Sequence, residues 1–120
     1  MMKLPFLDNL FVPEAKITQY LLHLGSENGK SKARFFLAFG FTIESWQTME
    51  AALKQHARTY TVADVVPRPP FGTNYVIEGL LITPDGRNPS VRVIWAIDVN
   101  GNVPRLVSAY PLSGDKANDK

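Results

Sequence analysis

Apolar residues recur at the three-to-four-residue spacing of helices through the first half of the chain. A first helix is expected to begin at Pro13, whose fixed φ suits a helix start, and to end at Gly25. A second helix, apolar at three phenylalanines, is closed by Gly40. The third follows Thr42, a good N-cap, and has Glu44 in its first turn. Its apolar face is expected to contain Trp46, Met49, Leu53 and Ala57.

The second half has the β-branched composition and alternation of strands. Residues 59–66 are rich in β-branched side chains, and a proline-rich break follows at 67–70. Three clearer strands are expected, at 73–81, 91–99 and 103–110. The fold class is therefore α+β, with about three N-terminal helices packed on a C-terminal antiparallel sheet of three to four strands. We expect one domain over residues 1–112 and a disordered polar tail at 113–120.

The pair Asn100-Gly101 between the last two strands is a hairpin signal, because both residues tolerate the positive φ angles of a type I′ turn. The register set by this turn places Trp95 opposite Leu106 and Val93 opposite Ser108. One face of the hairpin is then apolar and should pack against the helices. The other, partly polar face is expected to carry Arg92, Ile94, Ala96, Asp98, Arg105, Val107 and Ala109.

Composition limits the classes of protein. The 120 residues include no cysteine, which excludes disulfides, thiolate metal sites and cysteine nucleophiles. A net charge of +2 does not by itself argue for nucleic-acid binding, although cations can cluster locally. No apolar run has the length of a signal peptide or a membrane helix. We therefore expect a cytoplasmic protein without a membrane partner.

Cations gather where the second helix should begin, at Lys30, Lys32 and Arg34. A helix N-terminus disfavours cations but binds phosphate, so this grouping becomes favourable with a bound anion. The ordinary explanation is a solvated helix face, and the alternative is a cationic pocket for a phosphodiester. The preceding Gly25–Ser31 segment resembles a P-loop but is one residue short and follows a helix, which argues against nucleotide hydrolysis.

Two further residues have a functional and a structural explanation. Arg92, in an otherwise apolar strand, either pairs with a carboxylate such as Glu78 or binds a phosphate, as its neighbour Arg105 would. His56, near the end of the third helix, is either a cap or an acid–base group, and the helix dipole favours its protonated form. Two distant histidines indicate no metal site, and no cofactor is expected.

Distinctive motifs run from Val12 to Leu112. They include Gly29-Lys30-Ser31-Lys32-Ala33, Thr83-Pro84-Asp85-Gly86-Arg87 and Pro104-Arg105-Leu106-Val107. In these motifs the chain resembles an uncharacterised bacterial domain family. The order of helices then sheet resembles, at the level of fold, small metal-independent ribonuclease toxins such as the barnase, EndoU, colicin and RelE types.

The resemblance implies an RNA-directed, metal-independent ribonuclease, acting as a toxin beside a small antitoxin-like protein. Such cleavage needs an acid, a base and a cation for the phosphate. The catalytic candidates are His56 as acid or base, Lys32 and Arg92 on phosphate, and Ser108 or Tyr110 for orientation. Further phosphate contacts are expected from Lys30, Arg34 and Arg105. Val93 and Ser108 stand where threonine is usual in the family pattern, and Ser108 retains the hydroxyl.

Two other classes of function compete. A non-catalytic interaction module, either an inactive relative or a neutralising partner, predicts an apolar surface patch and ion-paired arginines. A small-ligand carrier would instead require Trp95 and Tyr75 to line a cavity in a curved sheet.

Overall fold

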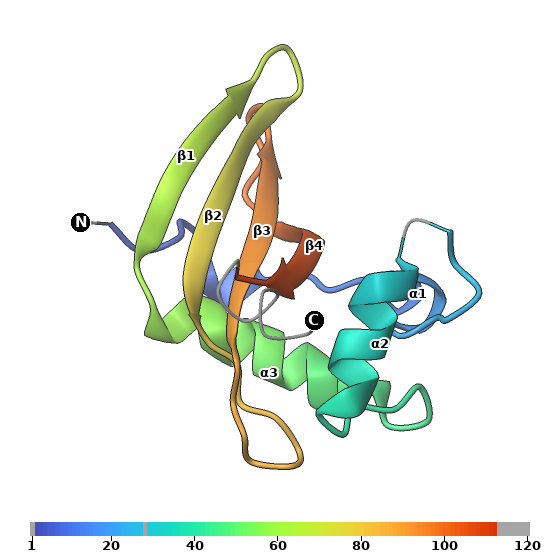
Figure 1. Cartoon of the computed structure of the whole chain (residues 1–120). Helices are drawn as coiled ribbons and strands as arrows, with labels where there is room; N and C mark the ends of the chain where they lie inside the picture. Colours follow the sequence, from blue (N-terminus) through green and yellow to red (C-terminus); the bar gives the residue numbers. More distant parts are fainter. Residues whose placement is uncertain (1, 28, 113–120) are drawn as a thin grey trace.

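The computed structural model describes residues 2–27 and 29–112 and has the α+β layout expected from the sequence (Figure 1). The predicted tail at 113–120 lies outside the described residues. The first half forms η1 (Leu7–Asn9), α1 (Glu14–Lys16), its continuation η2 (Ile17–Leu21), α2 (Lys30–Ala38) and α3 (Trp46–Thr59). The second half forms β1 (Val62–Arg68), β2 (Gly72–Leu80), β3 (Ser90–Asp98) and β4 (Arg105–Pro111). Over the described residues these strands make one antiparallel sheet in the order β1-β2-β3-β4.

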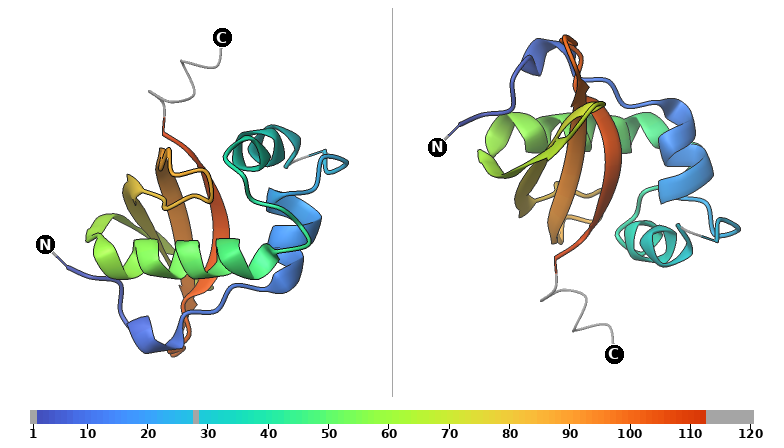
Figure 2. Two further views of the ribbon diagram at one scale, coloured as in Figure 1. Left: turned by 90° about the horizontal axis from the view of Figure 1, so that it is seen from below. Right: turned by 90° about the horizontal axis from the view of Figure 1, so that it is seen from above.

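The helices form two groups around this sheet. α3 crosses one face, whereas α1, η2 and α2 lie beside the edge strand β4 (Figure 2). The predicted apolar face of α3 is confirmed, because Met49, Leu53 and Ala57 are fully buried. The residues of the sheet buried in the same core are Ile77, Val91, Val93, Trp95, Ile97, Leu106 and Ala109. We call the side that α3 covers the helix face and the opposite side the open face.

The structure corrects three predicted boundaries. The first helix, which was expected to end at Gly25, ends as η2 at Leu21. α3 begins at Trp46, and the predicted N-cap Thr42 lies further upstream. Its Oγ1 accepts a hydrogen bond from the Ser45 N–H at 3.1 Å, so Thr42 caps a turn that precedes the helix. β1 continues through Pro67 to Arg68, where the sequence indicated a break. Because β1 is an edge strand, it tolerates a residue without an N–H group.

The turn between β3 and β4 also differs from the prediction. Asn100 has a φ of 62°, and the Gly101 N–H donates to the Asp98 carbonyl at 2.8 Å. A type I′ turn needs positive φ at both central residues, Asn100 and Gly101, but this hydrogen bond makes Asn100 the third residue of the turn, as in type II. The hairpin itself is confirmed, with a longer connection between its strands.

The register of this hairpin is correct at one end and wrong at the other. Trp95 lies opposite Leu106 as predicted, but Val93 lies opposite Ala109 in place of Ser108. The pairing shifts by one residue between Ile94 and Trp95, which makes a β-bulge around Val107 in β4. An extra residue in one strand reverses the faces of everything that follows it.

The bulge therefore changes which side chains reach the open face. Ala109, predicted on the polar face, is fully buried on the helix face. Ser108 and Tyr110 turn to the open face, where Tyr110 lies directly opposite Arg92. Glu78 of β2 is the partner of Arg92 on its other side, so the two charged side chains share this face.

The Pro84-Asp85-Gly86-Arg87 motif joins the sheet to α2. Arg87 Nη2 donates to the Ala38 carbonyl at 2.6 Å, and its guanidinium carbon lies 4.3 Å from the centre of the Phe39 ring. Arg87 Nε pairs with Asp85 Oδ2 at 2.6 Å. The hydrogen bond from the Arg87 backbone N–H is the largest cause that lowers the pKa of Asp85. Burial raises this pKa, but the side chains of Arg87 and Thr83 lower it as well, and the net effect is a lowered pKa. The motif thus closes the C-terminal end of α2.

His56 links α3 to the sheet on the helix face. It is buried, and its Nε2 donates to the Gly79 carbonyl at 3.2 Å. Its ring lies 5.2 Å from that of Tyr60, centre to centre. Burial lowers the pKa of His56 by more than the hydrogen bonds to the backbone of Gly79 and Val91 raise it. The predicted preference for the protonated form is therefore wrong, because loss of solvent outweighs the helix dipole.

We expect His56 to make the protein sensitive to acid. A buried histidine with a lowered pKa contributes stability that is present above its unfolded pKa of about 6.5 and is lost as the pH falls. In urea denaturation, the free energy of unfolding of His56→Gln should fall less than that of the wild type between about pH 7.5 and about pH 5. The same substitution at exposed His23 is the matched control. An equal flattening of the pH profile in both variants would contradict the assignment.

Candidate functional site

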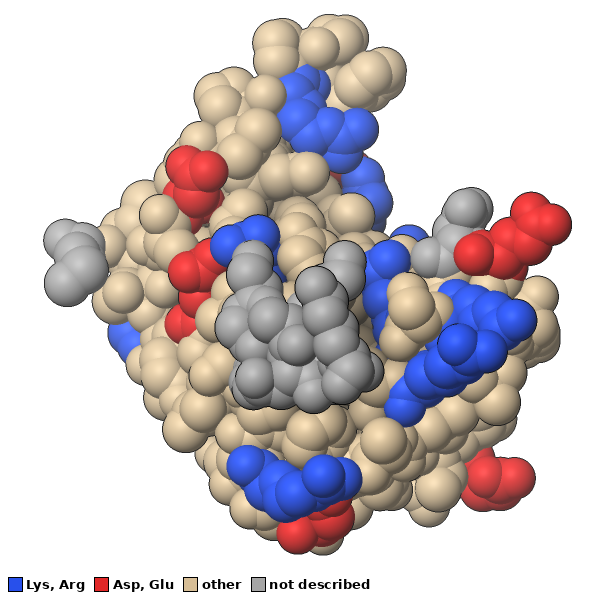
Figure 3. Space-filling view, viewed as in Figure 1, with Lys and Arg blue, Asp and Glu red and all other residues tan. Residues whose placement is uncertain are grey.

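Charged and aromatic side chains converge on the open face next to α2. We call the group Tyr20, Lys32, Arg92, Ser108 and Tyr110 the open-face cluster. Figure 3 shows Lys and Arg side chains on both sides of a hollow between the sheet and the helices beside β4. The members of the open-face cluster come from η2, α2, β3 and β4, so the cluster exists only in the folded chain.

Tyr110 lies between two cations. The Arg92 guanidinium carbon is 5.8 Å from the centre of the Tyr110 ring, and Lys32 Nζ is 6.0 Å from the same centre. Both distances are within reach of a cation–π attraction. Lys32 and Arg92, which the sequence analysis assigned jointly to phosphate, are therefore brought together with Tyr110.

Arg92 also has an anionic partner. Its Nε and Nη2 contact Glu78 Oε2 at 2.8 and 2.6 Å. The hydrogen bond to Glu78, and after it the one to Tyr110, raises the pKa of Arg92. Both side chains of the pair are about one-third exposed, 36% for Arg92 and 35% for Glu78. Of the two explanations for Arg92, the carboxylate pair is present, and the exposed guanidinium remains accessible on the open face.

Tyr20 is the residue that sequence reasoning missed. Its hydroxyl lies 3.3 Å from Ser108 Oγ. Lys16 Nζ and Lys32 Nζ lie 5.3 and 5.5 Å from the centre of its ring. Burial raises the pKa of Tyr20. Hydrogen bonds from Ser108 and Lys32, together with the charges of Lys32 and Lys16, lower this pKa by more than burial raises it. The net effect is a lowered pKa.

Gly29 sets the distance between α2 and Tyr20. A Cβ atom at Gly29 would lie 2.6 Å from the Tyr20 carbonyl oxygen and 3.0 Å from its ring carbon Cδ1. Glycine therefore lets the start of α2 pack against Tyr20. Lys32, about one turn further along α2, then reaches over the tyrosine ring.

The other predicted phosphate contacts lie outside the cluster. Lys30 and Arg34 are exposed and flank Lys32 by two residues on each side, a spacing that turns them to a different side of α2. Arg105 pairs with Asp98 at 3.2 Å near the opposite end of β4. His56 lies on the helix face, so the structure does not bring it to Lys32 and Arg92.

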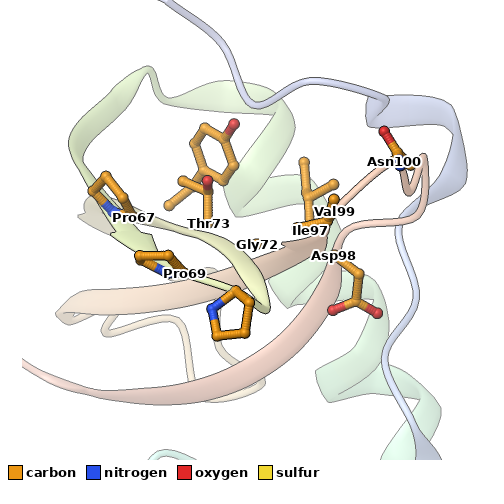
Figure 4. A pocket seen from close by; sticks show the side chains of 10 residues that line it. Pro67, Pro69, Gly72, Thr73, Ile97, Asp98, Val99 and Asn100 are labelled. Carbon is orange, nitrogen blue, oxygen red and sulfur yellow. The ribbon is translucent and has the colours of Figure 1, made fainter.

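A separate pocket lies at the end of the β1–β2 hairpin (Figure 4). Its volume is about 370 Å³, and Tyr75 is among its lining residues with Pro67, Pro69 and Asp98. Trp95 is fully buried in the core and does not line this pocket. The small-ligand hypothesis required both aromatic residues, so the burial of Trp95 contradicts it.

Within residues 2–27 and 29–112, no group of three or more histidine or acidic side chains is placed to hold a metal ion. In the same residues, no helix has the length and apolar character needed to cross a membrane.

Comparison with known proteins places the fold. A chain of a contact-dependent growth inhibition toxin–immunity protein complex from Klebsiella pneumoniae 342 has a similar structure, with a TM-score of 0.65 and 14% sequence identity. The similarity covers 84% of this chain and 98% of that chain. No curated protein sequence matches. A family model described as a domain of unknown function (DUF6883) matches residues 3–113, and the protein belongs to that family.

Proposed function

We propose that this protein is a metal-independent ribonuclease-like domain that acts on RNA as a component of a toxin–immunity system. The observation that carries the proposal is the convergence of Lys32 and Arg92 on the Tyr110 ring, beside the Ser108 hydroxyl. Cations from separate elements, next to an aromatic ring and a hydroxyl, are the groups that bind a phosphodiester and stack a base.

The charge of this region supports an anionic ligand. Lys16, Lys32 and Arg92 lie around the two tyrosine rings, and Arg92 pairs with the carboxylate of Glu78. Three cations grouped in this way favour a polyanion as the ligand. In the proposed site Lys32 and Arg92 bind the phosphate, while Ser108 and Tyr110 orient it.

The place of the protein in a toxin–immunity system rests on the structural neighbour. That chain belongs to a complex of a toxin with an immunity protein, and the similarity covers nearly all of it. We propose that a small neutralising protein is also the natural partner of this chain. The open face, with its excess of cations, is where such a partner would meet an enzyme of this kind.

Removal of a phosphate-binding cation should weaken RNA binding and its dependence on salt. For Lys32→Ala or Arg92→Ala, the slope of log affinity against log salt should decrease in magnitude by about one. Fluorescence anisotropy of a labelled single-stranded RNA measures this slope. Lys54→Ala is the matched control, because it removes the same charge from α3, where Lys54 pairs with Glu50 at 3.4 Å. An equal change in the control would mean that binding depends only on net charge.

Cleavage of RNA by the purified protein should persist in EDTA. Lys32→Ala and Ser108→Ala should each slow it by about 100-fold or more, because each removes a group that contacts the reacting phosphate. His56→Gln should retain cleavage at neutral pH, since His56 lies on the helix face. Denaturing gels of a defined RNA substrate, with circular dichroism as a folding control, measure the outcome. Wild-type rates in Lys32→Ala and Ser108→Ala would contradict the site.

A second function is favoured by specific contacts. Arg92 and Arg105 are both paired with carboxylates, as a non-catalytic interaction module predicts. The β1–β2 hairpin also exposes apolar side chains, with Val65, Val66 and Phe71 accessible over 42%, 41% and 68% of their surface. A folded wild-type protein that neither binds nor cleaves RNA would favour this function over a ribonuclease.

A further inference from the structure

We propose that Tyr20 is the general base of the site, the group that takes the proton from the attacking 2′-hydroxyl of RNA. This inference rests on the proposed ribonuclease function and assigns a role to a residue that the sequence motifs for phosphate binding do not include. The geometry that carries it is the position of the Tyr20 hydroxyl, at the junction of η2 with the open face and 3.3 Å from Ser108 Oγ.

The surroundings of Tyr20 differ from those of an ordinary core tyrosine. Its ring packs at the margin of the hydrophobic core, while its hydroxyl reaches the polar side of the sheet. Lys16 and Lys32 both hold an ammonium group over the same ring, at 5.3 and 5.5 Å from its centre. Two positive charges this close stabilise the phenolate relative to the phenol.

The proposed position also fits the groups that bind phosphate. Lys32 contacts the Tyr20 ring and the Tyr110 ring, at 5.5 and 6.0 Å, and so joins the base to the phosphate-binding part of the cluster. In the proposed site, a phosphate held by Lys32 lies on the side of the cluster where Lys32 contacts Tyr20. The adjacent 2′-hydroxyl of the same nucleotide needs only a hydrogen-bonding distance to that oxygen.

The reaction step balances with RNA, Tyr20 and water. The Tyr20 phenolate accepts the 2′-hydroxyl proton, the 2′-oxygen forms a bond to phosphorus, and the bond from phosphorus to the 5′-oxygen breaks. The leaving 5′-oxygen takes a proton from water, and the hydroxide so formed removes the proton from Tyr20. The products are a 2′,3′-cyclic phosphate and a free 5′-hydroxyl, and Ser108 holds the Tyr20 hydroxyl in place throughout.

Glu78 is the competing base on the same face. Its Oε2 already accepts from Nε and Nη2 of Arg92, at 2.8 and 2.6 Å, so this oxygen is engaged in an ion pair. Tyr20 has no carboxylate partner among its described contacts, and the groups around it are a hydroxyl and two ammonium groups. This difference favours Tyr20 as the proton acceptor.

The experiment measures single-turnover cleavage of a defined RNA in EDTA as a function of pH. Tyr20→Phe should lower the cleavage rate by about 100-fold or more at neutral pH while RNA affinity changes by less than about threefold. Fluorinated tyrosine placed only at position 20 lowers the pKa of the phenol, and it should shift the acidic limb of the rate profile to lower pH. Tyr60→Phe is the matched control, because Tyr60 packs against Gly79 on the helix face.

The possible results separate this inference from the function on which it rests. A folded wild-type protein without cleavage overturns the ribonuclease function and the role of Tyr20 together. Active wild type with an equally active Tyr20→Phe variant overturns the role of Tyr20 alone. An acidic limb that moves with Glu78→Gln and stays fixed with fluorinated Tyr20 identifies Glu78 as the base and also overturns the inference. Equal losses of rate and RNA affinity in Tyr20→Phe would show that the Tyr20 hydroxyl only holds the fold of the site together, and they would overturn its role as the base.

Discussion

The bulge in β4 is the constraint on which the open-face cluster depends. Without the extra residue near Val107, the alternation of β4 would place Ser108 and Tyr110 on the helix face, under α3. The bulge turns both to the open face, and it places the small Ala109 side chain in the core, where it is fully buried. Because Tyr110 then lies opposite Arg92, one local irregularity of the backbone brings the aromatic ring, the hydroxyl and the guanidinium to one surface.

The helical half completes the cluster through a close packing contact. Tyr20 reaches across the β4 edge to Ser108, and Gly29 leaves space for α2 to approach the tyrosine. This approach brings Lys32 over two aromatic rings, where its charge is held near the sheet. The motif around Arg87 closes the other end of α2 on the β2–β3 loop. α2 is thereby attached at both ends, which fixes the direction in which Lys32 points.

Much of the fold follows from local patterns in the sequence, but the site does so only in part. Periodicity was enough to predict α3 and the strands. The grouping of cations at a helix start indicated Lys32 as a phosphate ligand, and the position of Arg92 in an otherwise apolar strand indicated that residue. Periodicity could not place the bulge, because neither Val107 nor its neighbours in β4 are glycines that would mark a bulge. The shift in strand register depends on how Ala109 and Tyr110 pack. Tyr20 was missed because its spacing from Ile17 and Leu21 is that of a buried helix face, and its ring indeed packs there. Only its hydroxyl reaches the polar surface.

The ion pair between Arg92 and Glu78 and the proposed binding of phosphate are compatible on physical grounds. A guanidinium on a half-exposed strand face is stabilised by a nearby carboxylate when no ligand is bound, and it still presents donors to the solvent. A phosphate that enters meets repulsion from Glu78 and attraction from Arg92, Lys32 and Lys16. With three cations and the Glu78 carboxylate among the described residues, we expect attraction to prevail for a ligand with several phosphates. A single small anion gains less from this arrangement, and for this reason the function that we propose has a polyanion, RNA, as its ligand.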